Sequence, residues 1–543
     1  MFSSPLTLAL TLLGQTAGAP ADSAPLYDNL GDHHYEVTTG VPAAQAYFDQ
    51  GLRLYYAFNH SEAIRAFREA QRLDSTCAMC FWGEALAWGP NINAPMDSAG
   101  GVAAHAALQR ALAVRSHASE IERALIDALA ARYADPERAT ASRASLDSAY
   151  ATAMAEVARA YPTDQDVAVL YSESLMDLRP WNYWTSDGEL QPGMAGALSR
   201  LEQVVAANPK HPGACHFYIH AVEAAHPDRA VPCAERLAAL MPGAGHIVHM
   251  PGHIYIRVGR YLDAIKANEH AVHADQTYIR DQQPGVTVYT AGYYPHNYDF
   301  MAFAAAMAGR SKQAIQAADE LASVVPQEML GAPGMAFLQQ HVTRPLQLRV
   351  RFGHWDEILR SPAPREDLPH ARAMWHYARG RALAAQGKLQ EADAELAHVH
   401  SAAADPRLAG VKLEFNESPP VLSIAEHVLA GSIASKRGKH DEAIAHLEKG
   451  AAIEDGLTYG EPPEWTTPVR HDLGAALLAA GRPAEAEIVY RDDLERFPRN
   501  GWSLMGLSEA LRAQGQTGEA ERVAAELRRA WASADVSPTA SRF

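Results

Sequence analysis

Apolar and small residues recur along this chain at spacings of three and four, which is typical of amphipathic helices. The clearest example is residues 502–527, where a glycine separates two apolar stretches, and the preceding segment repeats the arrangement. Ala486 and Ala520 hold equivalent positions in these two segments and are 34 residues apart. The pattern predicts a series of helix pairs that repeat about every 34 residues.

Four earlier segments show the same order of small, apolar, glycine and alanine positions. Their first small residues are Gly51, Gly252, Gly380 and Gly431. Small residues let the two helices of a pair approach closely, and larger apolar residues fill the space between pairs. Because each pair leaves one apolar face uncovered, neighbouring pairs must stack. An all-α solenoid is therefore expected.

The period and the order of small residue, aromatic or leucine, alanine and terminal proline resemble the tetratricopeptide repeat (TPR) family, and the resemblance covers most of the chain after residue 44. It implies a right-handed superhelical solenoid of TPR-type helix pairs with several long ordered loops. Within that family, segments such as CFWGEALAWGPNINAPM and HIVHMPGHIYIRVGRY resemble a group of uncharacterised exported bacterial TPR proteins. That likeness implies no established activity.

The repeats and their interruptions predict eight segments. They are an export signal (1–21), an N-terminal linker (22–43), N-terminal TPR-like repeats (44–175), an aromatic loop insertion and helix (176–210), histidine-rich central repeats (211–325), further repeats (326–400), C-terminal repeats (401–532) and a disordered tail (533–543). Long connections rich in aromatic residues and proline occur at 178–195, 275–295, 401–421 and 455–468. We expect ordered loops there, which either fold over the solenoid or pack locally on its surface.

The N-terminus resembles a secretory signal. Leu6–Leu13 is apolar, Gly14 interrupts it, and small residues continue to Ala21, after which cleavage would fit the small-x-small rule. The usual basic start is missing, because no Lys or Arg precedes Arg53. A periplasmic or secreted protein is expected. The alternative is a disordered apolar terminus or a misplaced start codon.

Composition narrows the range of functions. A net charge of −17 without a basic stripe argues against nucleic acid as a partner. No later stretch reaches the roughly 18 apolar residues of a membrane-spanning helix. The chain lacks GxxxxGK[ST], GxSxG and HExxH motifs and a GxGxxG after a strand, so nucleotide chemistry and serine hydrolysis have no support.

Histidine is the distinctive residue. Of the 25 histidines, ten lie within residues 211–296. The TPR resemblance implies that certain first-helix positions line the concave groove, and these hold His246, His249 and His253 around Gly252. A one-residue shift aligns the preceding helix, which then offers His216, His220 and Glu223 on one face. With Ala302 as the next small residue, His296 and Asp299 take groove positions.

Imidazole nitrogens suit copper, zinc and iron, and carboxylates can complete or orient such a site. We therefore expect one or two transition metal ions held by these six histidines. Glu223, Asp299 and Glu84 are the candidate catalytic carboxylates, as ligands, proton carriers or a general base. A polar substrate groove and incidental packing are the alternatives. Pro251 is expected to begin or kink the helix that carries His253.

The four cysteines allow three disulfide pairings, and the candidates are Cys77–Cys80 and Cys215–Cys233. For Cys77 and Cys80, packing or a disulfide is favoured over metal. Trp181, Tyr293 and other aromatic residues line a pocket or belong to the core.

These observations predict one of two alternative functions. The first is an exported solenoid with a metal site, acting as a metal-dependent oxidoreductase or hydrolase on a small molecule or peptide in the groove. The second is a non-catalytic scaffold for a peptide or protein partner.

Overall fold

The computed structural model describes residues 24–133, 142–185 and 187–543, and the expected export signal, residues 1–21, lies outside them. The described residues are mainly helical, and their extended pairings are isolated bridges such as Asn91–Ala94. The chain forms two compact units. The first contains the described residues of Met1–Ile254 and Glu269–Tyr294, and the second contains those of Tyr255–Asn268 and Pro295–Phe543.

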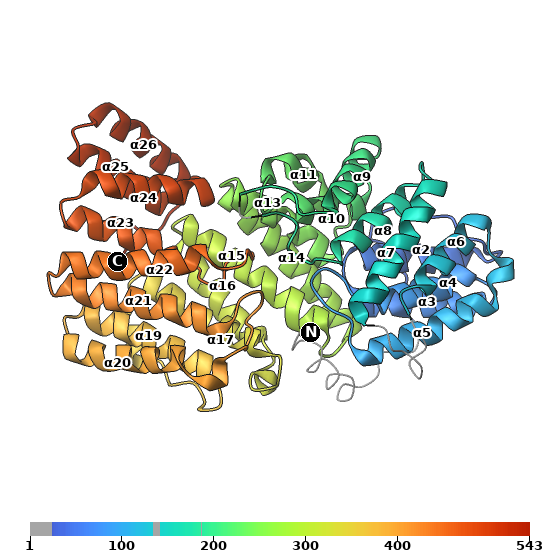
Figure 1. Cartoon of the computed structure of the whole chain (residues 1–543), viewed down its shortest axis with the longest axis horizontal. Helices are drawn as coiled ribbons and strands as arrows, with labels where there is room; N and C mark the ends of the chain where they lie inside the picture. The colour runs from blue at the N-terminus through green and yellow to red at the C-terminus, as the bar shows by residue number, and fades with distance from the viewer. Residues whose placement is uncertain (1–23, 134–141, 186) are drawn as a thin grey trace. The chain divides into compact units, whose positions relative to one another are not determined.

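The first unit is a series of helix pairs (Figure 1). Its helices are α2 (Pro42–Tyr56), α3 (His60–Leu73), α4 (Ala78–Ala87), α5 (Ser98–Ala113), α6 (Glu120–Ala130), α7 (Arg143–Ala160), α8 (Gln165–Met176), α9 (Met194–Ala207), α10 (Pro212–Val222), α11 (Val231–Leu240) and α12 (Gly245–His249), with short helices η2 (Arg115–His117) and η3 (Pro227–Ala230) and a π-helical turn η4 (Tyr289–Tyr293). Helices α13 (Pro251–Arg257), α14 (Tyr261–Gln282) and α15 (Tyr294–Met307) contain residues of both units.

The second unit continues the pattern, and in Figure 1 its helices α19 to α26 lie each beside the next. Besides α15 it contains α16 (Ser311–Val324), α17 (Ala336–Arg351), α18 (Trp355–Arg360), α19 (Pro369–Ala385), α20 (Leu389–Ala403), α21 (Ser418–Lys436), α22 (His440–Asp455), α23 (Val469–Ala479), α24 (Pro483–Arg496), α25 (Gly501–Ala513) and α26 (Thr517–Ala530), with short helices η5 (Gln327–Met329) and η6 (Pro406–Leu408).

One packing motif occurs in both units. In the first, the Phe67 ring of α3 lies between Gly51 of α2 and Gly83 of α4, where a Cβ atom would come within 2.6 Å and 2.4 Å of that ring. A side chain at either glycine would displace the ring, since interiors are close-packed. The small residue of the repeat is therefore the contact point for the aromatic residue of the second helix.

The second unit repeats this arrangement around Tyr490 of α24. A Cβ at Gly474 of α23 or at Gly506 of α25 would lie 2.3 Å or 2.1 Å from its ring. The turn between α23 and α24 contains Gly481 at a φ of +72°, a left-handed conformation that costs glycine little. The prediction of an all-α solenoid of TPR-like helix pairs is confirmed.

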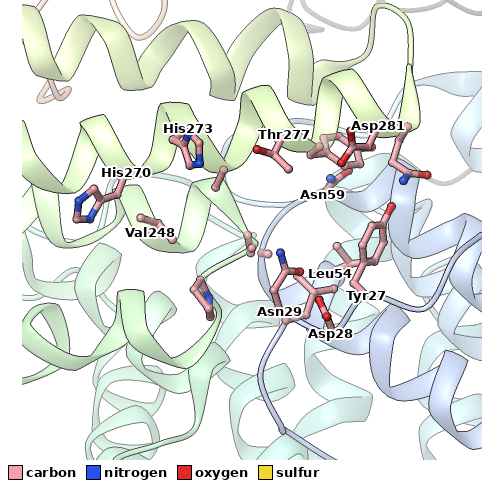
Figure 2. Close-up of a pocket in the computed structure, with 18 of the residues that line it drawn as sticks. Tyr27, Asp28, Asn29, Leu54, Asn59, Val248, His270, His273, Thr277 and Asp281 are labelled. Atoms are coloured by element: carbon pink, nitrogen blue, oxygen red, sulfur yellow. The ribbon is translucent and has the colours of Figure 1, made fainter.

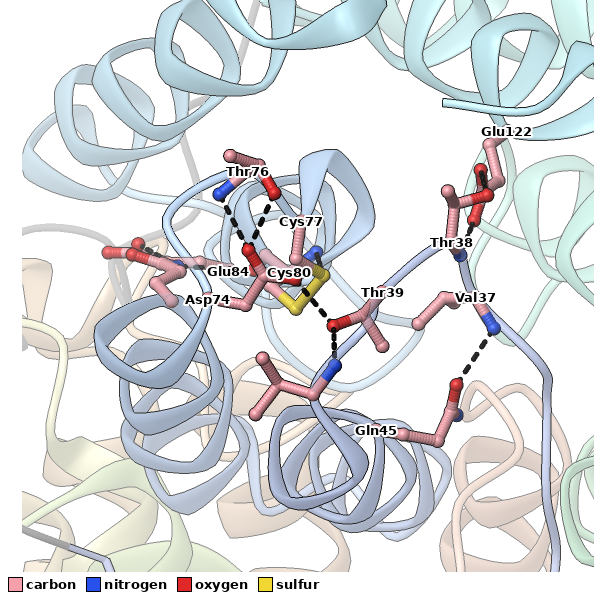
Figure 3. The surroundings of a disulfide bond; sticks show 12 residues. Val37, Thr38, Thr39, Gln45, Asp74, Thr76, Cys77, Cys80, Glu84 and Glu122 are labelled. Carbon is pink, nitrogen blue, oxygen red and sulfur yellow. Dashed lines mark hydrogen bonds between the residues drawn. A yellow bond between two sulfur atoms is a disulfide. The ribbon is translucent and has the colours of Figure 1, made fainter. Parts of the chain in front are cut away.

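A disulfide joins Cys77 to Cys80 at the start of α4 (Figure 3). The N-terminal segment runs beside it. The Thr39 hydroxyl donates to Asp74, and the Thr38 amide and hydroxyl donate to Glu122. These bonds fix the segment before α2 to the end of α3 and to α6.

Three of the expected loops differ from a simple connection. Residues 275–295, expected to be a loop, are mostly helical, because α14 continues to Gln282 and η4 begins at Tyr289. In the second unit, Glu464 accepts hydrogen bonds from the Phe415 and Asn416 amides, so the two long loops after α20 and α22 pack against each other.

Residues 533–543, expected to be a disordered tail, have defined contacts with the second unit. The Ser541 side chain is buried and donates to the His471 carbonyl, and Arg542 pairs with Asp472. Among the described helices, none has the length and apolar character needed to span a bilayer.

Candidate metal centre

Helix α10 brings the first two histidines together. It starts at Pro212, whose fixed φ suits a first turn, and all its residues are buried. Gly213 lets the helix approach Tyr56, since a Cβ there would lie 2.6 Å from that ring. His216 and His220 are one turn apart on the same face, and their ring centroids are 5.0 Å apart.

The short helix α12 supplies the next ligand candidates. Gly245 opens it, and a Cβ there would lie 1.9 Å from the Asp275 carboxylate. His246 Nε2 lies 3.2 Å from His216 Nε2 across the two helices. The helix ends at His249, and Pro251 begins α13, as expected from the missing proline N–H.

Two overlapping groups of ligand atoms result, both within the first unit. His216, His220 and His246 offer one atom each, all within 4.8 Å of one another, and His220, Glu223 and His253 do the same. His220 belongs to both groups. Glu223 Oε2 lies 3.2 Å from His253 Nδ1, and His249 Nε2 lies 2.9 Å from His253 Nε2.

Hydrogen bonding defines which nitrogen of His216 is available. Its Nδ1 donates to the Tyr56 carbonyl at 2.6 Å, so the neutral ring carries its lone pair on Nε2, facing His246. His220 has no hydrogen-bond partner on either nitrogen within the described part of the chain, and its Nδ1 lies 3.6 Å from Glu223 Oε2. Buried imidazoles normally have partners, so His220 is exceptional.

The electrostatics favour neutral rings. Burial, followed by the proximity of other imidazoles, holds the pKa of His216, His220 and His246 well below the usual value for histidine. A neutral imidazole has a lone pair that can ligate a metal, whereas the protonated form has none. The group therefore has the protonation state that a metal site requires.

Aromatic side chains enclose the first group. The Phe58 ring stacks on His246 at 5.3 Å, the Trp181 ring meets His220 edge-on at 5.1 Å, and the Tyr293 ring lies 4.6 Å from His246. Phe58 and Trp181 have φ values of +55° and +64°, an uncommon conformation for bulky residues that costs energy. The Trp181 indole N–H donates to Asn93.

The remaining expected site residues are His296, Asp299 and Glu84. His296 and Asp299 belong to α15 in the second unit, where Arg344 binds both Asp299 oxygens at 2.7 Å. Glu84 on α4 pairs with Arg68 and Arg110. Glu223 is the expected catalytic carboxylate that the structure brings to the histidines.

A third group, His33, Asp166 and His211, was not expected from the sequence, because three distant segments supply it. Asp166 Oδ1 lies 2.9 Å from His33 Nε2 and 3.4 Å from His211 Nε2, and it accepts from the Tyr56 hydroxyl. His211 Nδ1 accepts the Ala214 amide, which leaves the proton on Nε2. His211 therefore has no lone pair for a metal, and this group is a polar network centred on Asp166, which is hydrogen-bonded to His33 and Tyr56.

A cavity of about 880 Å³ lies in the first unit (Figure 2). Val248 of α12 lines it together with Tyr27, Asn29, His270 and His273, but His246 and His249 of the same helix do not. Tyr289 also lines the cavity, and its hydroxyl accepts the His246 amide at 3.1 Å. One helix thus presents a face to the cavity and another to the histidine group.

Comparison with known proteins gives likeness in fold alone. Neither a protein-family model nor a curated protein matches this chain. The human IFIT1 dimer with PPP-AAAA is 13% identical with a TM-score of 0.32, covering 88% of each chain. The Cut9–Hcn1 hetero-tetramer of the APC/C has 13% sequence identity and a TM-score of 0.32, and the match covers 90% of this chain and 76% of that one. The P58(IPK) TPR domain has 13% sequence identity and a TM-score of 0.19, and the match covers 68% of this chain and 93% of that one. Sequence identities and TM-scores this low give no evidence about activity.

Proposed function

We propose that the first unit holds a transition metal ion, copper, zinc or iron, between His216, His220 and His246. The observation that carries this proposal is the convergence of three buried imidazoles whose ligand atoms lie within 4.8 Å of one another, with His220 lacking any hydrogen-bond partner among the described residues. A buried polar ring without a partner is costly, and a bound cation would satisfy it.

The surroundings of the three rings fit a metal ligand set. The hydrogen bond from His216 Nδ1 to a backbone carbonyl is the kind of outer contact that orients a ligating histidine. Three imidazoles, with one coordination position left open, are a donor set known for catalytic ions. The enclosing aromatic rings would lower the local dielectric and exclude bulk water.

Glu223 and His253 extend the site. Glu223 would act as a further ligand or as the proton carrier, with His249 and His253 as ligands of a second ion. A bound ion can polarise a substrate or lower the pKa of water, or it can exchange electrons. We infer a metal-dependent oxidoreductase or hydrolase that acts on a small molecule, because the ligand atoms are almost fully buried.

The proposal includes export to the periplasm or beyond. Support comes from the apolar start of the sequence and from the Cys77–Cys80 disulfide, because disulfides persist in oxidising compartments. The second candidate is a non-catalytic scaffold for a peptide or protein partner. The TPR-like helix pairs and the 880 Å³ cavity of the first unit favour it.

Elemental analysis of untagged protein tests the metal proposal. We expect one or two ions per chain, and loss of the ion held by His216, His220 and His246 in His220→Gln and in His246→Gln. His226→Gln is the matched control, because His226 lies on the surface just beyond α10. Adding the ion back to stripped protein should raise its unfolding free energy by about 2.7 kcal/mol at 100 times Kd.

Two results separate the candidates. A metal content in both variants equal to that of wild type would contradict this ligand set. Folded wild-type protein that neither contains nor takes up copper, zinc or iron would remove the metal centre and leave the scaffold.

A further inference from the structure

Helices α10 and α11 present a second pair of cysteines to each other. Cys215 Sγ lies 2.6 Å from Cys233 Sγ, and both side chains are buried, with 0% and 1% exposure. Non-bonded heavy atoms pack at roughly 3.5 Å or more. Two separate thiols do not fit at this distance, whereas bonded sulfurs lie about 2.05 Å apart.

The chemical surroundings favour oxidation of this pair. The Arg236 guanidinium lies 3.7 Å from Cys233 Sγ and is one turn away on the same helix, so this cation is beside Cys233 before α11 packs on α10. A thiolate is the nucleophile in disulfide exchange. The other two cysteines of the first unit, Cys77 and Cys80, are already joined, so the conditions that oxidise one pair are available to the other.

We propose that Cys215 and Cys233 form a second disulfide, which fixes α10 to α11 directly beside His216. The Cys233 thiolate attacks the disulfide of an oxidising thiol–disulfide protein or small molecule and forms a mixed disulfide. The Cys215 thiolate then displaces the oxidant. Two protons leave the cysteines, and two electrons reduce the oxidant to a dithiol. Because both sulfurs are buried, the exchange occurs before α11 packs on α10.

The bond has a consequence for the histidine group. Cys215 is adjacent to His216, and His220 follows one turn later on the same helix. Joining α10 to α11 would limit the movement of both ligands, which favours metal binding because less ordering is needed. This consequence rests on the proposed metal centre, whereas the disulfide does not.

Peptide mapping tests the bond directly. The purified full chain is denatured in the presence of an alkylating agent, which blocks free thiols, and in the absence of reductant. It is then digested with trypsin. We expect residues 211–229 linked to residues 230–236, and their separation by reductant. Cys77 and Cys80 share one tryptic peptide, residues 73–110, so they cannot produce this link.

Cys215→Ser should make Cys233 fully alkylated, while Cys77→Ser should leave the linked peptides intact. Alkylated Cys215 and Cys233 in wild-type protein before reduction would overturn the proposal.

Metal binding provides the second measurement. In Cys233→Ser, which alters α11 and no proposed ligand, we expect several-fold weaker metal binding and a thermal midpoint lower by several degrees. Unchanged affinity would overturn the link between the bond and the ligands. Linked peptides in a wild-type protein that takes up no metal would instead count against the proposed function alone.

Discussion

His220 in the first unit and His471 in the second are both buried histidines on repeat helices, and they differ in their partners. The Arg351 guanidinium donates to His471 Nδ1 at 2.7 Å, and His471 Nε2 donates to Asp493 at 2.9 Å. Asp493 in turn accepts from Ser503. Neither nitrogen of His220 has a hydrogen-bond partner within the described residues.

Burial alone therefore does not identify a functional histidine. Both ring nitrogens of His471 have hydrogen-bond partners, which is the ordinary condition of a buried polar group. His220 is equally buried, but neither of its ring nitrogens has a hydrogen-bond partner among the described residues. Other imidazoles and a carboxylate lie around it. The difference fits a structural role for His471 and the ligand role that we propose for His220.

Replacing each histidine by leucine in metal-free protein is the strongest test of this difference. His471→Leu leaves Arg351 and Asp493 buried without their shared partner, so we expect a loss of about 3–5 kcal/mol in unfolding free energy. His220→Leu removes no hydrogen bond and should change it by less than about 1.5 kcal/mol. Urea unfolding measures both. Equal losses would show that His220 is a structural residue too.

A third buried histidine sharpens the comparison through pH. His370 contacts Ser418 and Gln340, and burial lowers its pKa to about 3. Between pH 3 and about 6.5 the unfolded state binds a proton that the folded state does not, so stability falls as pH falls through that window.

We expect His370 to contribute about 2 kcal/mol of lost stability between pH 7 and pH 5. Over this interval the unfolding free energy of His370→Gln should therefore fall by about 2 kcal/mol less than that of wild type. Urea unfolding at both pH values measures the difference. His398→Gln, on the exposed face of α20, is the control and should follow wild type. A pH dependence of His370→Gln equal to that of wild type would contradict the assignment.

The smallest effect concerns the backbone of the repeat that carries His471. Gly481 has a φ of +72°, and a Cβ added there would have no neighbouring atom within 4 Å, so Gly481→Ala meets conformational strain without a clash. We expect a loss of about 1 kcal/mol, and a smaller loss for Gly481→Asn, since Asn tolerates this conformation. Thermal unfolding compares the two. An alanine variant as stable as wild type would argue against a left-handed turn.

Much of the fold could be predicted because its determinants are local. The small residues Gly51, Gly83, Gly474 and Gly506 recur with the repeat, and each contacts an aromatic residue of a neighbouring helix. Pro251 likewise predicted the helix start, because a missing N–H acts within one turn. The continuation of α14 to Gln282 was missed, since aromatic residues in 275–295 gave the appearance of a loop.

The candidate site was predictable in part. Helical spacing placed His216 and His220 on one face, and the repeat resemblance pointed to His246. The role of the Tyr56 carbonyl, the left-handed Phe58 and Trp181, and the His33–Asp166–His211 network could not be predicted, because residues far apart in sequence meet there.

The sequence by itself determined the helix pairs, their period and the histidines that each helix could offer, because these depend on contacts within one or two turns. Only the tertiary structure decided which imidazoles meet and which nitrogens have hydrogen-bond partners. It also decided that Asp299 and Glu84 are held by arginines. The reason is physical. A hydrogen bond or a metal–ligand bond forms only when the two atoms, often from different helices, are placed to within a few tenths of an ångström, whereas helical periodicity fixes only the face on which a side chain lies.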